Sequence, residues 1–318
     1  MAKSVLSDLR FHNEKAAFAY VEAQLWPNGP VCPHCGAFGE KIGRLEGVRS
    51  KPSKKHPEGV EQVGLRKCYA CREKFTVRKG TIFEDSHLPL RYWLQAIHLL
   101  CASKKGISTR QLQRMLGCGM KTAWHLGHRI REAMTPDQSS GPLGGAGKTV
   151  EGDETALTNS RKTKRGPGRK KPHALVLSFA ERGGDVRSVS LDHRGVASHI
   201  RHMVHKDSRL VTDKARHYAL PPVADHDSVD HSKFEWARGD VHTNTLEGFF
   251  SVIKRGLVGV YQHVDKRHLD RYLAEFDFRQ NTRAALGIDD NERTKRAVRG
   301  MVGKRLTYRD SSVSDARE

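Results

Sequence analysis

Long apolar runs, acidic residues and cysteine are all scarce in this sequence. No apolar stretch approaches the roughly 20 residues that a membrane-spanning helix needs, and the charged segment after Met1 lacks the apolar core of a signal peptide. Asp and Glu number 36 against 56 Lys and Arg, which gives a net charge of +20. These features predict a cytoplasmic protein of two or three domains with a polyanionic partner, most commonly DNA or RNA. Anionic membrane surfaces would attract the same charge.

Only six cysteines occur, and in a reducing compartment cysteines rarely form disulfides. Four of them form two C-x-x-C knuckles: Cys32, Cys35, Cys68 and Cys71. Each knuckle is a tight turn that aims two thiolates at one tetrahedral ion, so we predict a zinc site. A redox C-x-x-C is disfavoured because two knuckles occur together, and a mixed site that uses His34 is the other alternative. Cys101 and Cys118 stand alone, and we interpret both as structural.

The zinc site is predicted to belong to a first domain of residues 1–88. An amphipathic pattern within residues 1–25 predicts a helix, and the two knuckles follow it as a zinc ribbon. The polar run 51–59 is interpreted as a loop at the tip of the ribbon.

Residues 89–136 are predicted to form a helix-turn-helix. Pro89 suits the first turn of one helix, and a short helix over Ile107–Leu116 is followed by the glycine-containing turn 117–119 and by a second helix, Met120–Met134. This spacing is typical of helix-turn-helix motifs, although such helix pairs more often serve packing alone. The ribbon and the basic charge favour DNA binding. On the second helix, the basic side chains predicted to lie outside are Lys121, His125, His128, Arg129 and Arg131.

Three acidic residues organise the second half of the chain. Asp153 lies in a short predicted strand, Asp213 ends another, and Glu247 lies where apolar residues recur at helical spacing. Two acids from strand ends and one from a nearby helix can converge on divalent cations, which need charged oxygen ligands. Lys254 follows Glu247 by two helical turns on the same face. An isolated acid after a strand is more often a turn or cap residue, so the order of the three motifs carries the interpretation.

At these residues the sequence resembles the DDE transposases of bacterial insertion sequences, in the group with an N-terminal zinc ribbon and a ribonuclease-H-like catalytic core. The resemblance extends over roughly Trp26 to Arg283. The matching motifs are Val150–Thr155, Thr212-Asp213 with Tyr218, His242-Thr243-Asn244 with Glu247, Lys254-Arg255, Gly259-Val260-Tyr261, and His268–Arg283. Asp213 and Glu247 are 34 residues apart, the short gap expected of the last two acids.

The resemblance implies a chemistry and a set of partners. Asp153, Asp213 and Glu247 would hold Mg²⁺ or Mn²⁺, and Lys254 would contact DNA. Asp153 is favoured over Glu154 mainly by the resemblance, because on a strand Glu151 shares the face of Asp153 and Glu154 points oppositely. The implied partners are double-stranded DNA, at the element ends and at the target, and further copies of the chain in the DNA complex. The implied location is cytoplasmic and nucleoid-associated.

The fold class predicted from this order of elements is multidomain α+β. A catalytic domain of residues 148–283 would have a ribonuclease-H-like mixed sheet, after a Ser/Gly-rich linker at 136–147. Residues 284–318 are interpreted as a polar tail. The insertion 161–171 holds seven basic residues in eleven and is interpreted either as a solvated loop or, with slight preference, as an arm that orders on phosphates.

The predicted function is therefore Mg²⁺-dependent cleavage of DNA at the element's terminal repeats and joining of the ends to target DNA, a phosphoryl transfer performed twice. Two alternatives remain. One is a nuclease of the same fold that cleaves without joining strands, and the other is a transposase-derived DNA-binding regulator that has lost its chemistry. The three intact acids argue against the regulator.

Overall fold

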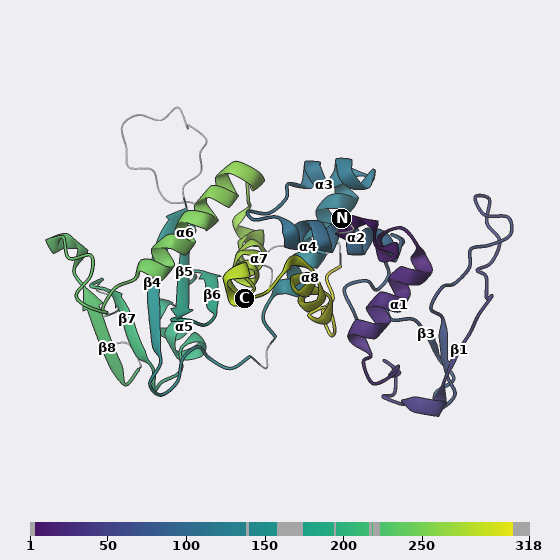
Figure 1. The fold of residues 1–318 in the computed structure, drawn as a ribbon, viewed down its shortest axis with the longest axis horizontal. Helices are drawn as coiled ribbons and strands as arrows, with labels where there is room; N and C mark the ends of the chain where they lie inside the picture. Colours follow the sequence, from purple (N-terminus) through teal and green to yellow (C-terminus); the bar gives the residue numbers. More distant parts are fainter. Residues whose placement is uncertain are drawn as a thin grey trace. The chain divides into compact units, whose positions relative to one another are not determined.

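The computed structural model divides the chain into two compact units. Residues 4–137, 140–157, 174–193, 195–215, 218 and 223–307 are described, and the basic insertion 161–171 lies outside them. Unit 1 combines Met1–Ala102, Thr109–Met134 and Asp289–Glu318. Unit 2 combines Ser103–Ser108 and Thr135–Ile288 (Figure 1).

Unit 1 begins with short 3₁₀ turns and helix α1, followed by a small three-stranded sheet. Helix α1 spans Glu14–Leu25, and the Asn13 side chain caps it by accepting a hydrogen bond from the Ala16 amide at 3.1 Å. The antiparallel sheet has the order β1-β2-β3. Its strands are β1 (Ile42–Arg44), β2 (Arg66–Cys68) and β3 (Lys74–Phe75). The sheet is short because its core is little more than the cysteines with Phe75 and Trp26.

Four further helices complete unit 1: α2 (Leu90–Ala102), α3 (Thr109–Leu116), α4 (Met120–Met134) and α8 (Asp290–Arg299). The predicted helix pair is therefore present, and Gly117 between α3 and α4 takes the positive φ of +62° that favours glycine. No helix among the described residues is long and apolar enough to cross a membrane.

The C-terminal segment differs from the polar tail that the sequence suggested. Helix α8 packs against α1 and α2, and the His98 and Thr294 side chains, both buried, lie 3.2 Å apart. Ala297, Val298 and Met301 are also buried. Helix α8 is mostly charged, so only its few apolar positions on one side reveal that it belongs to a core.

Unit 2 contains a mixed five-stranded sheet in the order β6-β5-β4-β7-β8. Its strands are β4 (Thr149–Leu157), β5 (Ala174–Glu181), β6 (Val186–Ser190), β7 (Arg209–Asp213) and β8 (Asp225–Val229). Strands β4, β5 and β6 are joined antiparallel, while β7 runs parallel to both β4 and β8. Strand β8 was not predicted, because its sequence, Asp-His-Asp-Ser-Val, is mostly polar and holds a single β-branched residue, Val229.

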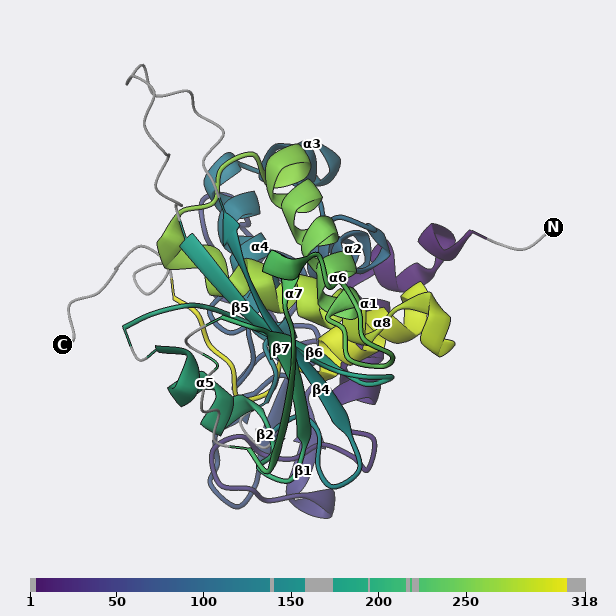
Figure 2. The same cartoon turned by 90° about the vertical axis from the view of Figure 1, so that its left-hand side faces the viewer.

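Helices cover both faces of this sheet (Figure 2). Helix α5 (Gly195–Met203) packs on one face, in a core with Val150, Phe179 and Leu210. Helices α6 (Asn244–Gly256) and α7 (Leu269–Asn281) pack on the other. The apolar residues of α6, spaced three and four apart, bury against β5 and α7: Leu246, Phe249, Phe250 and Ile253.

Helix α7 also satisfies the outer edge of strand β6. The amides of Val186, Ser188 and Ser190 each donate a hydrogen bond of 2.7 Å to a side chain of α7. The acceptors are Asn281, Asp277 and Asp270, in that order. An exposed edge would otherwise offer these amides to another strand, so the helix protects the sheet from edge-to-edge association.

Candidate functional site

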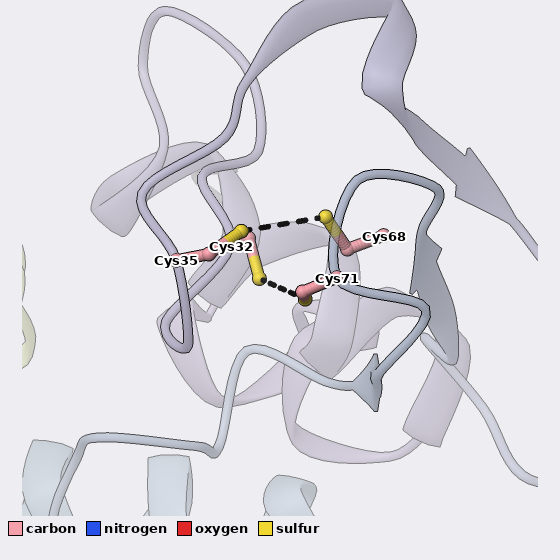
Figure 3. A group of neighbouring side chains, drawn as sticks. All are labelled: Cys32, Cys35, Cys68 and Cys71. Carbon is pink, nitrogen blue, oxygen red and sulfur yellow. Dashed lines mark hydrogen bonds between the residues drawn. The ribbon is translucent and has the colours of Figure 1, made fainter.

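The four cysteines of the two knuckles form a single cluster (Figure 3). Their sulfur atoms all lie within 4.8 Å of one another. The Cys32–Cys71 and Cys35–Cys68 sulfur pairs are each 3.7 Å apart. Four sulfurs at the corners of a tetrahedron, each about 2.3 Å from a zinc ion, would be about 3.8 Å apart. The spacing therefore fits zinc, and His34, which is exposed, is not part of the cluster.

The electrostatics of the cluster also favour a bound cation. Backbone hydrogen bonds from Cys71 and Ala70 lower the pKa of the Cys68 thiol to about 7. A backbone hydrogen bond from Glu73 lowers the pKa of Cys71, but burial and the three neighbouring sulfurs raise it to about 12. Four thiolates this close repel one another strongly unless a cation compensates their charge.

The acids predicted for catalysis lie on three neighbouring elements of unit 2. Gly152 of β4 pairs with Thr212 of β7 in parallel register, so Asp153 and Asp213 are the next residues on two adjacent strands. Helix α6, which carries Glu247 in its first turn, packs against β4 and β5. Sequence elements far apart in the chain thus bring the three acids to one region of the sheet.

The surroundings of Asp153 shift its pKa. Burial raises the pKa of Asp153 to about 7, and the negative charges of Glu154, Asp213 and Glu247 raise it as well, against a hydrogen bond from the Glu154 amide. Asp213 and Glu247 are therefore both close enough to act electrostatically on Asp153. They are less tightly gathered than the cysteines, which are the one group of three or more possible ligands that the described residues bring close enough to hold an ion.

Glu151 is a charged residue of this region to which the sequence assigned no role of its own. Its carboxylate is fully buried and accepts hydrogen bonds from Arg182 Nε at 2.9 Å and from both the amide and the hydroxyl of Thr245 at 3.0 Å. Arg182 also donates to the backbone oxygen of His242 at 3.0 Å. Because Thr245 lies in the first turn of α6, Glu151 ties the start of this helix, two residues before Glu247, to strand β4.

Glu154 points to the opposite face of β4, as the alternation of a strand predicts. Its carboxylate accepts a hydrogen bond of 2.8 Å from the hydroxyl of Tyr218, which is buried in the core beneath α5. The structure thus separates the acids of the first cluster: Glu151 and Asp153 face α6, and Glu154 faces α5.

Glu247 and Lys254 are both exposed on α6. Their separation of seven residues places them on one side of the helix, two turns apart. Lys254, in the last turn of the helix, therefore lies on the same side as Glu247 in the first turn.

The basic residues of helix α4 differ from the sequence prediction. Lys121 is exposed, but His128, Arg129 and Arg131 are buried, so the expectation that they lie outside is wrong. Arg129 Nη2 donates to the backbone oxygen of Glu84 at 2.6 Å, and its guanidinium lies 5.2 Å from the centre of the Trp93 ring. Helical periodicity assigned these residues to the free face, whereas Glu84 and Trp93 lie against Arg129.

A cavity of about 530 Å³ remains between this segment and α4. Its lining includes residues 85–88, Trp93, Lys121, His125 and Arg129. The side of α4 that carries Lys121 is therefore hollowed and not a simple convex ridge.

Two family models match the chain, one over the region of the cysteine cluster and one over the region of the three acids. The transposase zinc-ribbon domain matches residues 12–74, and the ISXO2-like transposase domain matches residues 142–281; together the matches take in more than half of the chain. A relative from Halobacterium salinarum, described as an uncharacterized protein in transposable element ISH50, is 29% identical over 289 residues. The alignment includes 85% of this chain and 92% of the relative.

These matches coincide with the two candidate sites. The zinc-ribbon match takes in Cys32, Cys35, Cys68 and Cys71, and together with the cluster it supports Zn²⁺ as the bound ion. The transposase-domain match contains Asp153, Asp213 and Glu247. The chain belongs to the insertion-sequence transposases that join an N-terminal zinc ribbon to an ISXO2-like transposase domain.

Proposed function

We propose that this transposase binds the terminal repeats of its insertion sequence, cleaves the DNA there and joins the ends to target DNA. One observation supports the proposal above the others. Asp153 and Asp213 follow a paired position on adjacent parallel strands, and the charges of Asp213 and Glu247 both act on Asp153. Burial, together with the neighbouring acids, raises the pKa of Asp153, which means that its ionised carboxylate is unfavourable there without a compensating cation. The acids are therefore suited to divalent cations.

Asp153, Asp213 and Glu247 are the residues that would hold Mg²⁺ or Mn²⁺, because carboxylate oxygens are the ligands these ions prefer. Two such ions supply activation of the attacking oxygen and stabilisation of the leaving oxygen at one phosphorus. The protein's own contribution is position: the paired strands fix the two aspartates, and the bonds of Glu151 fix the start of the helix that carries Glu247. Lys254 is proposed to contact a phosphate beside them.

The arrangement of unit 2 supports a ribonuclease-H-like core. Three antiparallel strands, with strands β7 and β8 added in parallel on the other side of β4, form the mixed sheet that we predicted for this domain, although β8 itself was not predicted. In unit 1, helices α3 and α4 are proposed to act as a helix-turn-helix with Lys121 in contact with DNA. Arg129 and Arg131 would have to be uncovered before they could reach DNA, so we do not propose them as direct contacts in this conformation.

Strand transfer is the experiment that tests the proposed function. The substrate is a pre-cut element end with a free 3′-hydroxyl, mixed with a supercoiled target and Mg²⁺, and the joined product is scored. Asp153→Asn, Asp213→Asn and Glu247→Gln should each abolish both cleavage and joining while binding to the ends survives. Glu154→Gln is the matched control, because it makes the same change on the same strand but on the face toward Tyr218.

The outcomes separate the alternatives. Full activity of Asp213→Asn would refute the metal-site proposal. A wild-type protein that nicks DNA in Mg²⁺ but never joins strands would be a nuclease, and one that binds the ends without either reaction would be a regulator.

A further inference from the structure

The segment 230–243, between strand β8 and helix α6, exposes two aromatic side chains. Phe234 is 83% exposed, the highest value of any large apolar residue among those the structure describes, and Trp236 is 60% exposed. Phe234 also has a backbone φ of +60°, which is rare for a bulky residue and unfavourable unless its surroundings fix it. Exposure and strain coincide at one residue, and this combination suggests a partner.

Hydrogen bonds hold the segment in this conformation. The Asp230 amide donates to the Glu235 carboxylate at 3.0 Å, and the Lys233 amide donates to the Asp230 backbone oxygen at 2.9 Å. Further along, the backbones of Arg238 and Val241 bond to each other in both directions. Phe234 therefore lies in a hydrogen-bonded turn, and its side chain is exposed within that ordered structure.

The position of this turn connects it to the acids. Val229, the last residue of β8, pairs with Asp213, so the turn begins directly beside the end of β7. Its first residue, Asp230, also forms an ion pair of 3.4 Å with Lys214. At its other end the segment leads into α6 and Glu247. The exposed aromatic residues thus lie on the chain between two of the three acids.

The charges of the turn indicate which part of DNA would meet it. The segment 230–243 carries three acids, Asp230, Glu235 and Asp240, against Lys233 and Arg238, so it has no net positive charge. A phosphate would gain little here, whereas the flat apolar face of a nucleobase stacks well on an aromatic ring and does not depend on charge. In duplex DNA these faces are covered by neighbouring bases, so the base must be unpaired or unstacked.

We propose that Phe234, assisted by Trp236, stacks on an unpaired nucleobase next to the phosphate held at the acids. The inference rests on the proposed function, because it requires DNA at Asp153, Asp213 and Glu247. Stacking would keep the DNA end open and in place while its neighbouring phosphate lies at the acids.

Binding to two DNA probes tests this proposal. One probe is a blunt duplex, and the other is the same duplex with a short unpaired extension that carries 2-aminopurine; both are titrated with the full-length protein in Ca²⁺. Stacking on the ring should quench the 2-aminopurine fluorescence. Phe234→Ala should remove the quenching and weaken binding to the extended probe by roughly 5- to 150-fold, the effect of losing one base–aromatic stack. Binding to the blunt duplex should change little, and Phe234→Trp should restore both signals.

Phe38→Ala is the matched control, because Phe38 is 74% exposed but lies in the zinc-ribbon region. It should leave the ratio of the two affinities and the quenching unchanged. Unaltered quenching and affinity ratio in Phe234→Ala would overturn the proposal. It would also be overturned if that variant changed only the sedimentation of the DNA-free protein, since Phe234 would then contact a second copy of the chain. Failure of the wild-type protein in strand transfer would instead refute the proposed function and leave the stacking result to be judged by itself.

Discussion

Replacing Glu151 by glutamine tests whether the start of helix α6 is held by a buried charge. The substitution keeps the shape of the side chain but changes one acceptor oxygen into an NH₂ donor. All the hydrogen bonds to the carboxylate come from donors: Arg182 Nε and the amide and hydroxyl of Thr245. Either orientation of the new amide therefore places a donor against a buried donor, and the charge that compensates Arg182 is lost.

The size of the effect follows from the burial of the two partners. Breaking a fully buried ion pair by removing one charge costs about 3 to 5 kcal/mol. The lower end applies here, because the Arg182 side chain is 25% exposed and keeps its bond to the His242 backbone oxygen. A loss of about 3 kcal/mol should lower the melting temperature of a unit of this size by roughly 6 to 12 °C. Local opening at Thr245 should increase most, because its amide loses its acceptor.

Thermal unfolding and hydrogen exchange of the Thr245 amide measure these effects. Glu154→Gln is the control, since a glutamine oxygen can still accept the hydrogen bond from Tyr218, and we expect a change within about 1 kcal/mol. In combination with Arg182→Met, Glu151→Gln should cost less than the sum of the single changes, because both remove the same pair. Equal stability of Glu151→Gln and Glu154→Gln would refute this account of how α6 is anchored.

The sequence predicted those parts of the structure that have strong local signals. The cysteine knuckles, the helices α1 to α4 and α6, and the strands β4 and β7 follow from spacing and apolar periodicity, and the structure confirms them. The facing of the first acidic cluster was also predictable from the alternation of a strand, with Asp153 and Glu154 on opposite faces. Each of these features depends on a few neighbouring residues.

The parts that were missed depend on residues distant in the chain. Arg129 is buried because Glu84 and Trp93 lie over it, and the sequence of its own helix does not predict these contacts. Glu151 receives its role from Thr245, 94 positions later. The aspartates of α7 act as acceptors for the edge of β6, a pairing that requires knowledge of which strand is outermost. Periodicity indicates which side of an element is apolar, but it does not indicate what covers the polar side.

Three further predictions concern the ribbon, helix α4 and helix α7. Cys68→Ser should release the zinc ion, measured by metal analysis, and should unfold the ribbon because such domains owe their folding largely to the metal; a ribbon that stays folded after chelation would contradict this. Lys121→Ala should weaken DNA binding and its salt dependence without changing the melting temperature, whereas Arg129→Ala should lower the melting temperature, because Arg129 is buried against Trp93; the reverse pattern would refute the assignment.

Asp277 makes the stability of unit 2 depend on pH. Burial raises the pKa of Asp277 to about 7, against the hydrogen bonds from Ser188. A carboxyl group whose pKa is higher in the folded state than in the unfolded state binds more protons when folded, so it stabilises the protein most below its unfolded pKa of about 4. This contribution is lost as the pH rises toward 7. Asp277→Asn does not titrate and still accepts the bond from the Ser188 amide, so its free energy of unfolding should fall less than that of the wild type between these pH values. The free energies of unfolding of the two proteins are measured by chemical denaturation across this pH range. If both change with pH in the same way, Asp277 titrates normally and its burial against β6 does not raise its pKa.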